Sequence, residues 1–155
     1  MAHQKLQAPK TTKHLQQYGE WLKTGQGAPP IATLIGLQPT LLELGKAGMR
    51  LEASARHSNP MGTLHGGVLC DLADATMGYA MITTLEDDES FTTLDLTIKF
   101  LKPIWNATLT ATAVVTKRTR TLGLVECEVE DEKGSLVAKV LSTCMVLRGE
   151  EAKGR

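Results

Sequence analysis

Hydrophobic side chains recur at helical spacing near the start of the chain. Within residues 11–23 the apolar positions fall on one helical face, which predicts a short amphipathic helix. These positions are Leu15, Tyr18, Trp21 and Leu22. The stretch 25–30 follows, and its glycines and prolines are expected to end the helix, because neither residue type continues a helix well.

A second and longer helix is predicted over residues 65–84, where a turn-free apolar stretch follows the loop 57–64. At 100° per residue, one stripe of this helix is apolar and is expected to face a β-sheet. This stripe comprises Val68, Leu72, Ala75 and Tyr79. A second stripe, about a quarter turn away, carries a carboxylate, Asp74, between Gly67 and Gly78.

Six further segments are rich in β-branched residues or alternate between apolar and polar positions, as strands do. Their ranges are 39–44, 49–56, 92–101, 107–117, 124–130 and 136–147. The residues expected on one face of the third segment are Leu94, Leu96, Ile98 and Phe100. The last segment is apolar on both faces, which is typical of a strand at the centre of a sheet.

Consecutive strands, with one long helix early among them, predict an α+β fold in which an antiparallel sheet wraps around the central helix. A chain of 155 residues is enough for one such domain with its own core. We divide the sequence into an N-terminal helix and linker (1–29), the main domain (30–148) and a polar C-terminal tail (149–155) that is expected to fray.

The composition narrows the classes of partner. Charge is balanced, with 17 Lys and Arg against 17 Asp and Glu, so neither nucleic acid nor a membrane surface is expected as the main partner. No apolar run approaches the ~20 residues that span a bilayer, and residues 1–17 lack the apolar stretch of a secretory signal. Three cysteines without paired spacing favour reduced thiols in a cytoplasmic protein. The four histidines never share a ligand spacing with cysteine, so no metal is expected, and no other cofactor.

The densest group of candidate functional residues lies between positions 59 and 74. A loop runs into His65, Gly66 and Gly67 at the start of the central helix, where unpaired N–H groups and the helix dipole can hold a polarised oxygen. A carboxylate in apolar surroundings, here Asp74, is costly unless it is paired, solvated or used. Together they point to acyl-group chemistry. The plainer alternative is that the glycines permit tight packing and that Asp74 is solvated.

The spacing Asn-x-x-Gly-x-x-His-Gly-Gly, followed by six residues and an Asp, is met by Asn59, Gly62, His65, Gly66, Gly67 and Asp74. It resembles the pattern of the hotdog-fold acyl-CoA thioesterases, specifically their phenylacetate-degradation branch. The likeness continues through 93–96 (Thr-Leu-Asp-Leu) and 100–103 (Phe-Leu-Lys-Pro), and covers roughly residues 30–148. It implies a hotdog fold and the hydrolysis of an acyl- or aryl-CoA thioester to a free acid and coenzyme A.

The resemblance also implies a role for each matching residue. Asp74 would be the nucleophile or general base, and the Gly66 N–H would polarise the thioester carbonyl, with Gly67 assisting at the substrate. The Asn59 amide would share that task, although an asparagine before a proline is more commonly a turn former. His65 would order the loop and the start of the helix.

Thr93 matches the serine or threonine that holds the attacking water in this family. Strand alternation, however, places Thr93 on the face opposite Leu94 and Leu96. It is therefore expected to reach the site only through a bulge in its strand or from a partner chain. Asp71 is left unassigned, because a carboxylate near a helix N-terminus usually complements the dipole.

The distance between two of these residues bears on the assembly. Gly66 and Asp74 are eight residues apart, hence about 12 Å along a helix. An oxyanion donor and an attacking carboxylate must both lie within roughly 3–3.5 Å of one carbonyl group. One helix cannot supply both, whereas two antiparallel helices about a twofold axis can. We expect a homodimer that shares its sites across the interface, as family members do, and a dimer of dimers (homotetramer) beyond it.

Two other functions stay open at this point. Hotdog hydratases and dehydratases use a catalytic histidine near the position of Asn59, whereas the histidine here is His65. A non-catalytic acyl-CoA-binding protein would keep the pocket without the chemistry. The acyl group itself, whether aryl, arylacetyl or medium-chain, does not follow from the sequence.

Overall fold

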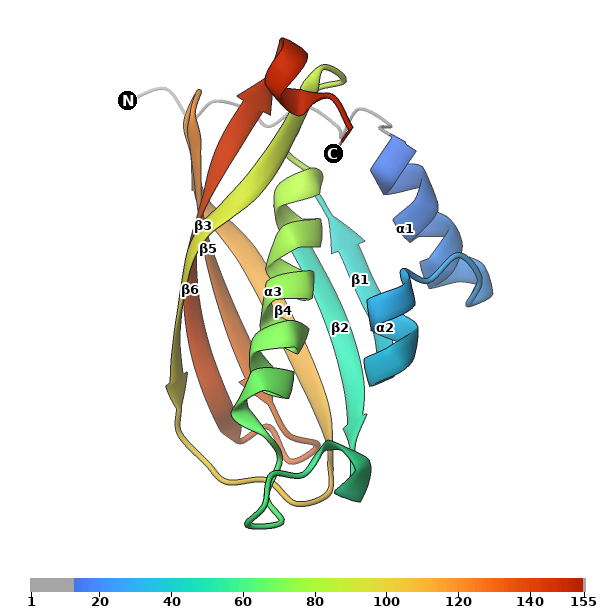
Figure 1. Cartoon of the computed structure of the whole chain (residues 1–155), viewed down its shortest axis with the longest axis vertical. Coiled ribbons are helices and arrows are strands. Elements are labelled where there is room, and N and C mark those ends of the chain that lie inside the picture. The colour runs from blue at the N-terminus through green and yellow to red at the C-terminus, as the bar shows by residue number, and fades with distance from the viewer. Residues whose placement is uncertain (1–12, 155) are drawn as a thin grey trace.

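The computed structural model (Figure 1) describes residues 13–154 and places one long helix against a six-stranded sheet. The helices are α1 (Lys13–Thr24), α2 (Pro30–Ile35) and α3 (Gly66–Ile82), with 3-10 helices η1 (Ala55–His57) and η2 (Gly149–Ala152). The strands are β1 (Leu37–Glu43), β2 (Lys46–Ala53), β3 (Glu89–Phe100), β4 (Ala107–Arg118), β5 (Leu122–Glu130) and β6 (Leu136–Arg148). The predicted α+β fold is confirmed, and so are its six strands, with ends that move by a few residues. The tail expected to fray begins with η2.

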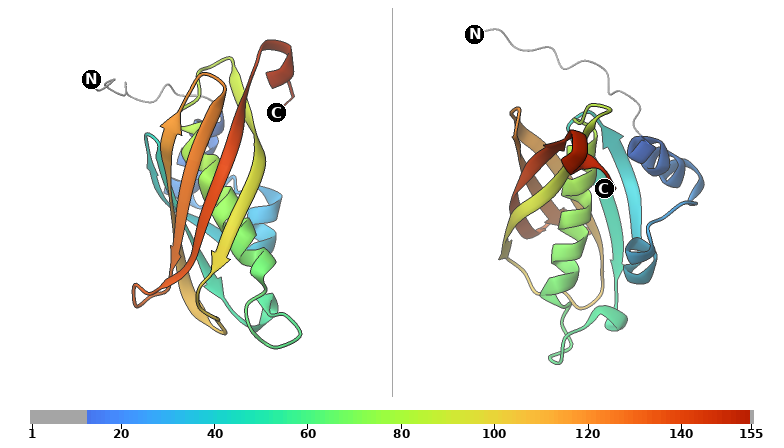
Figure 2. Two further views of the ribbon diagram at one scale, coloured as in Figure 1. Left: turned by 90° about the vertical axis from the view of Figure 1, so that its left-hand side faces the viewer. Right: turned by 45° about the horizontal axis from the view of Figure 1, so that its top comes forward.

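All neighbouring strands are antiparallel, in the order β1-β2-β4-β5-β6-β3. The sheet curves around α3, as the views in Figure 2 show. α1 and α2 lie beside β1 at one edge, and β3 forms the opposite edge (Figure 1). No residue of β3 is fully buried in the single chain. One long edge strand is thus left open to another partner.

α2 is an element that the hydrophobic pattern does not predict. Pro30 occupies its first turn, where the missing N–H would have no intrahelical partner in any case. Gly36 ends it in the left-handed conformation, with φ 92° and its N–H donating to the Ala32 oxygen at 2.8 Å. A glycine and proline segment therefore both terminates α1 and starts a second helix.

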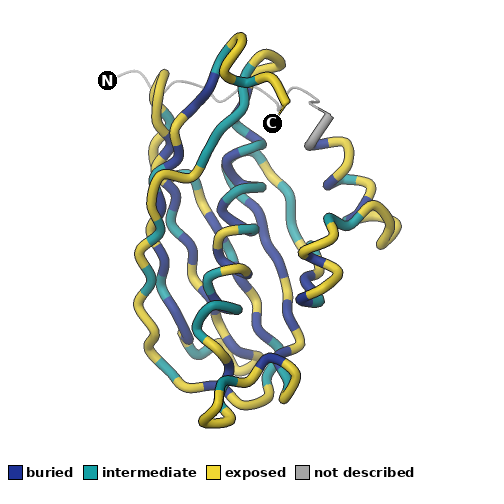
Figure 3. Tube along the Cα trace, viewed as in Figure 1, coloured by how far each residue is buried: buried dark blue, intermediate teal, exposed yellow. Residues whose placement is uncertain are grey.

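The buried face of α3 differs from the predicted stripe. Its buried residues are Leu69, Leu72, Ala73, Thr76, Met77, Ala80 and Met81. Of the predicted stripe, Leu72 alone is fully buried, and the other three positions are half-buried. The reason is that α3 packs on two sides: the Tyr79 ring lies 4.0 Å from that of Tyr18 on α1, between centroids. The Tyr18 hydroxyl in turn donates to the Gly48 oxygen of β2 at 2.9 Å. Figure 3 shows the buried positions gathered between α3 and the sheet.

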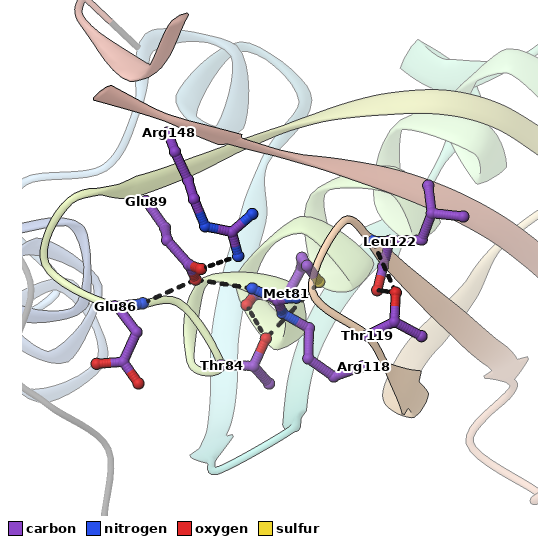
Figure 4. Close-up of polar contacts among 8 residues, drawn as sticks. All are labelled: Met81, Thr84, Glu86, Glu89, Arg118, Thr119, Leu122 and Arg148. Atoms are coloured by element: carbon purple, nitrogen blue, oxygen red, sulfur yellow. Dashed lines mark hydrogen bonds and ion pairs between the residues drawn. The ribbon is translucent and has the colours of Figure 1, made fainter. Parts of the chain in front are cut away.

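An ion cluster ties the start of β3 to two other strands (Figure 4). The Glu89 carboxylate accepts hydrogen bonds from Arg118 of β4 (2.7 Å), from Arg148 of β6, and from the Glu86 N–H (3.1 Å). Burial raises the pKa of Glu89, but the Glu86 N–H and the two guanidinium groups outweigh it and hold that pKa below its usual range. The cluster therefore fastens the edge strand at the end where α3 finishes.

Candidate active site

Asn59 holds the loop before α3 in one shape. Its side-chain oxygen accepts the backbone N–H groups of Met61 (2.9 Å) and Thr63 (3.2 Å). Its amide nitrogen donates to Thr63 Oγ1 at 2.8 Å, which uses one of the two amide hydrogens. The structure thus shows the turn-forming contacts that are common for asparagine before proline.

A buried histidine, which the sequence pattern does not single out, fastens this loop to the rest of the domain. His57 Nδ1 accepts the Ser54 N–H at 3.2 Å, and Nε2 lies 2.9 Å from the Ile35 oxygen. Because Nδ1 is the acceptor, Nε2 carries the proton and donates it to Ile35. The His57 oxygen accepts the His65 N–H at 2.9 Å. Its partner Ile35 ends α2, so the role becomes visible only once α2 is placed.

At the mouth of α3, one backbone N–H is open and the next is capped. His65 is the N-cap residue, and its Nδ1 accepts the Gly67 N–H at 2.9 Å. Within residues 13–154 the Gly66 N–H has no hydrogen-bond partner. A Cβ at Gly67 would lie 2.8 Å from His65 Nδ1, so glycine at this position allows the imidazole to approach. The donor available to a ligand is therefore that of Gly66.

Asp74 lies about two turns further along α3 and points toward β3. Thr93 Oγ1 of β3 donates to Asp74 Oδ1 at 3.4 Å, which is longer than an ordinary hydroxyl–carboxylate bond. The residue is exposed on the single chain, and neighbouring protein atoms partly bury its carboxyl. That burial raises the pKa of Asp74, the Thr93 hydrogen bond lowers it, and the charge of Asp71 raises it, for a net upward shift.

Thr93 reaches Asp74 within one chain because β3 contains a bulge. The pairing with β6 runs Thr93↔Cys144 and then Asp95↔Thr143, so Leu94 is an extra residue. The expected alternation breaks at this point: Leu94 does not continue the row of Leu96, and it is 53% exposed. Of the two routes expected for Thr93, a bulge or a partner chain, the structure contains the bulge.

Gly66 and Asp74 belong to one uninterrupted helix. Their separation along its axis is about 12 Å, so a carbonyl group held by one is out of reach of the other. On the single chain the two groups therefore lie apart, one at the mouth of α3 and the other beside β3.

An open pocket of about 460 Å³ lies beside Gly66. It is lined by Thr63, Leu64, Gly66, Leu69 and residues 100–104. The Phe100 ring rests on Gly66, and the Lys102 ammonium at the rim is paired with the Asp131 carboxylate. Burying an apolar group against these walls is favourable, so the pocket suits the apolar part of a ligand.

The described part of the chain holds no group of three or more His, Cys, Asp or Glu placed to bind a metal ion. Its three cysteines, Cys70, Cys127 and Cys144, form no disulfide. Among residues 13–154 no helix combines the length and the apolar character needed to cross a membrane.

The chain is similar in sequence to proteins of known family. A family model described as "Thioesterase superfamily" matches residues 61–138. A protein of Saccharolobus solfataricus that carries an esterase name is 32% identical over 107 residues, which are 69% of this chain and 76% of that protein. The 1,4-dihydroxy-2-naphthoyl-CoA hydrolase of Listeria monocytogenes is 29% identical over 112 residues, 72% of this chain and 89% of the relative.

Solved structures agree on the fold. The PaaI protein of the E. coli phenylacetic acid degradation operon superposes with a TM-score of 0.75 at 24% identity, over 86% of this chain and 96% of that one. The long helix, the curved antiparallel sheet and the loop ahead of the helix are therefore those of a hotdog domain.

Proposed function

We propose, because the chain belongs to the thioesterase superfamily, that it hydrolyses an acyl-CoA thioester to a free acid and coenzyme A. The observation that carries the proposal is that α3 presents both an open N–H, at Gly66, and a carboxyl of raised pKa, at Asp74. The name of the Listeria relative, a CoA-ester hydrolase, supports the coenzyme A half of the substrate.

Each group has a chemical task in this proposal. The Gly66 N–H and the α3 dipole stabilise the negative charge that develops on the carbonyl oxygen during attack. Asp74 either takes the proton of an attacking water or attacks the carbonyl carbon itself, and its raised pKa makes it a stronger base than an ordinary aspartate. In the first route water forms the new C–O bond, the C–S bond breaks, and the coenzyme A sulfur takes the proton that Asp74 removed. In the second, coenzyme A leaves as a thiolate and an acyl–Asp74 anhydride forms, which water then hydrolyses to the free acid and Asp74.

Four further residues, Thr93, His65, Asn59 and Gly67, support this chemistry in the proposal. Thr93 orients the Asp74 carboxylate and holds the water that is split. His65 caps α3, which leaves the Gly66 N–H as the open donor. The second amide hydrogen of Asn59 adds a donor for the carbonyl oxygen once a partner chain completes the site. Gly67 permits the cap and a close approach of substrate.

A complete site takes Gly66 from one chain and Asp74 from another, because one helix cannot bring both to a single carbonyl. The open edge of β3, at the side of the domain that carries Thr93, is where a second copy can add its own β3. The proposed assembly is thus at least a homodimer, and pairs of dimers would form the tetramer.

The test is a free-thiol release assay over a panel of aryl-, arylacetyl- and straight-chain acyl-CoAs, with one acyl-carrier-protein thioester. Release should be fast for at least one acyl-CoA and should fall to background in Asp74→Asn. If every substrate gives only the background rate while acyl-CoA still binds, the protein is an acyl-CoA-binding protein and not a hydrolase.

A further inference from the structure

The bulge in β3 changes which residues face α3. Before it, Phe91 faces the helix, since its ring lies 3.4 Å from a Cβ built on Gly78. After it, Phe100 faces the helix, since its ring lies on Gly66. Phe91 and Phe100 differ by an odd number of positions, so they could not share a face in a regular strand. The extra residue, Leu94, reconciles the two phases and brings Thr93 to the Asp74 side.

Two hydrogen bonds from β6 hold this bulge. The Asp95 carboxylate accepts the backbone N–H of Thr143 at 3.1 Å, and the Ser142 hydroxyl donates to the backbone oxygen of Asp95 at 2.8 Å. Both replace ladder bonds with side-chain bonds at the place where pairing is disrupted. Ser142 is 4% exposed, so its hydroxyl satisfies an oxygen away from bulk water.

The same region is continuous with Thr93. Thr93 pairs with Cys144, which lies two residues beyond Ser142 on β6. The Cys144 thiol lies beside the hydroxyls of Thr93 and Ser142. The contact from Thr93 to Asp74 is already long at 3.4 Å. A small relaxation of an edge strand at the bulge would break it, because hydrogen bonds weaken steeply beyond that distance.

We propose that Asp95 and Ser142 are positioning residues of the reaction: they clamp the β3 bulge and so hold Thr93 against Asp74. The inference rests on the proposed function only for the role of Asp74 in catalysis. Neither residue touches the substrate.

The first test compares Asp95→Ala with Asp95→Asn. The alanine loses the acceptor for Thr143, whereas the asparagine keeps an acceptor oxygen at the same place. We expect Asp95→Ala to lower kcat roughly tenfold with little change in KM, as loss of one positioning hydrogen bond would. Asp95→Asn should recover most of that loss. Thr97→Val, on the outer side of the same strand, is the matched control and should behave as wild type.

A carboxyl titration of Asp74, followed by NMR, separates the clamp from a simple charge effect. Removing the negative charge of Asp95 would by itself lower the pKa of Asp74. Losing the Thr93 hydrogen bond would raise it. The other ionisable groups near this carboxyl are Asp71 and Cys70 on α3 and Cys144 on β6, and none is altered. An upward shift in Asp95→Ala supports the clamp, and a downward shift overturns it.

Ser142→Ala provides an independent variant on β6, away from the open edge, in case Asp95→Ala does not fold. It should shift the Asp74 titration upward as well. In a Thr93→Val background neither substitution should lower kcat further, and the uncharged change Ser142→Ala should leave the titration in place, since the group they position is gone. Additive losses in that background would overturn the clamp.

The titration also keeps the two proposals apart. If no acyl-CoA is hydrolysed, or if Asp74→Asn keeps full activity, the proposed function fails. The clamp then still stands or falls on the direction of the Asp74 shift in the Asp95 and Ser142 variants.

Discussion

Phe100 rests directly on Gly66. A Cβ built at Gly66 would lie 3.0 Å from Phe100 Cζ and 3.2 Å from Cε1, closer than carbon atoms normally approach. Glycine at the first helical position thus serves two ends. It lets the ring of the edge strand close over the helix mouth, and it lines the pocket together with that ring.

This contact separates two roles of Gly66 experimentally. Gly66→Ala adds a Cβ but keeps the N–H, whereas Gly66→Pro adds the ring and removes the N–H at a position where proline is tolerated. Because the Phe100 ring is the tip of a side chain, it can move, and the alanine variant should keep much of its turnover. The proline variant should lose ~10²–10³-fold in kcat, as other enzymes do without one oxyanion donor. Equal activity of the two folded variants would remove the N–H from the mechanism.

Asp74→Asn should abolish thioester hydrolysis while leaving Tm and the assembly unchanged. The raised pKa of Asp74 means that its ionised form is disfavoured in the folded state, so removing the charge should not reduce stability at neutral pH. Asp71→Asn, an exposed carboxylate on the same helix, is the matched control and should keep most activity. A reversed ranking in the same thiol-release assay would transfer the role to Asp71.

The rate should depend on the ionised form of Asp74. Its pKa lies above the ordinary value for aspartate, about 3.9, so kcat should begin to fall on acidification at a pH above that of an unperturbed carboxyl. Thr93→Val removes the hydrogen bond that lowers this pKa, and should move the acid limb of the pH–rate profile to higher pH. The outer-face variant Thr97→Val should leave the limb in place. If the acid limb of the pH–rate profile does not move in Thr93→Val, then the Thr93 hydroxyl does not influence the pKa of Asp74.

Glu89→Gln should destabilise the fold by about 2 kcal/mol at pH 7, since it weakens hydrogen bonds from two guanidinium groups. The pKa of Glu89 is lowered in the folded state, so its stabilisation is present above the unfolded pKa and is lost as pH falls through the folded pKa. Thermal melts should therefore show the two proteins converging in acid. Glu128→Gln, an exposed partner of Lys139, should cost well under 1 kcal/mol. A constant gap at every pH would mean that Glu89 acts through packing.

Two differently inactivated chains should complement one another if the site is shared. One chain would carry Asp74→Asn and the other Gly66→Pro. In a mixed dimer one site inherits both lesions and the other neither, and about half of the dimers are mixed by random assortment, so roughly a quarter of wild-type activity should return. Co-expression is required if the dimer is obligate. Inactive mixtures, with heterodimers verified by native mass spectrometry, would place each site within a single chain.

Much of the fold follows from local periodicity. The alternation of β5, with Val125, Cys127 and Val129 buried, and the apolar character of β6 depend on side chains that lie within one strand, and such patterns are visible in sequence. The hydrophobic pattern does not predict α2, because a helix of six residues with two buried positions, Ala32 and Ile35, is too short to show a helical repeat next to its prolines. The pattern also does not predict which face of α3 is buried, because α3 packs against α1 as well as the sheet. The helical repeat of α3 alone does not reveal that second neighbour.

The sequence by itself determined which residues make up most of the candidate site. Asn59, His65, Gly66, Gly67 and Asp74 lie within one loop and one helix, where the number of residues between two positions fixes the distance between them. Only the tertiary structure decided how their polar groups are shared. It assigned the Gly67 N–H to His65, left that of Gly66 open, and used a single extra residue in β3 to turn Thr93 toward Asp74. The phase of β3 is set at its bulge by β6, whose Ser142 hydroxyl donates to the Asp95 oxygen although the two residues are 47 positions apart in the sequence. The pattern within β3 alone therefore does not reveal it.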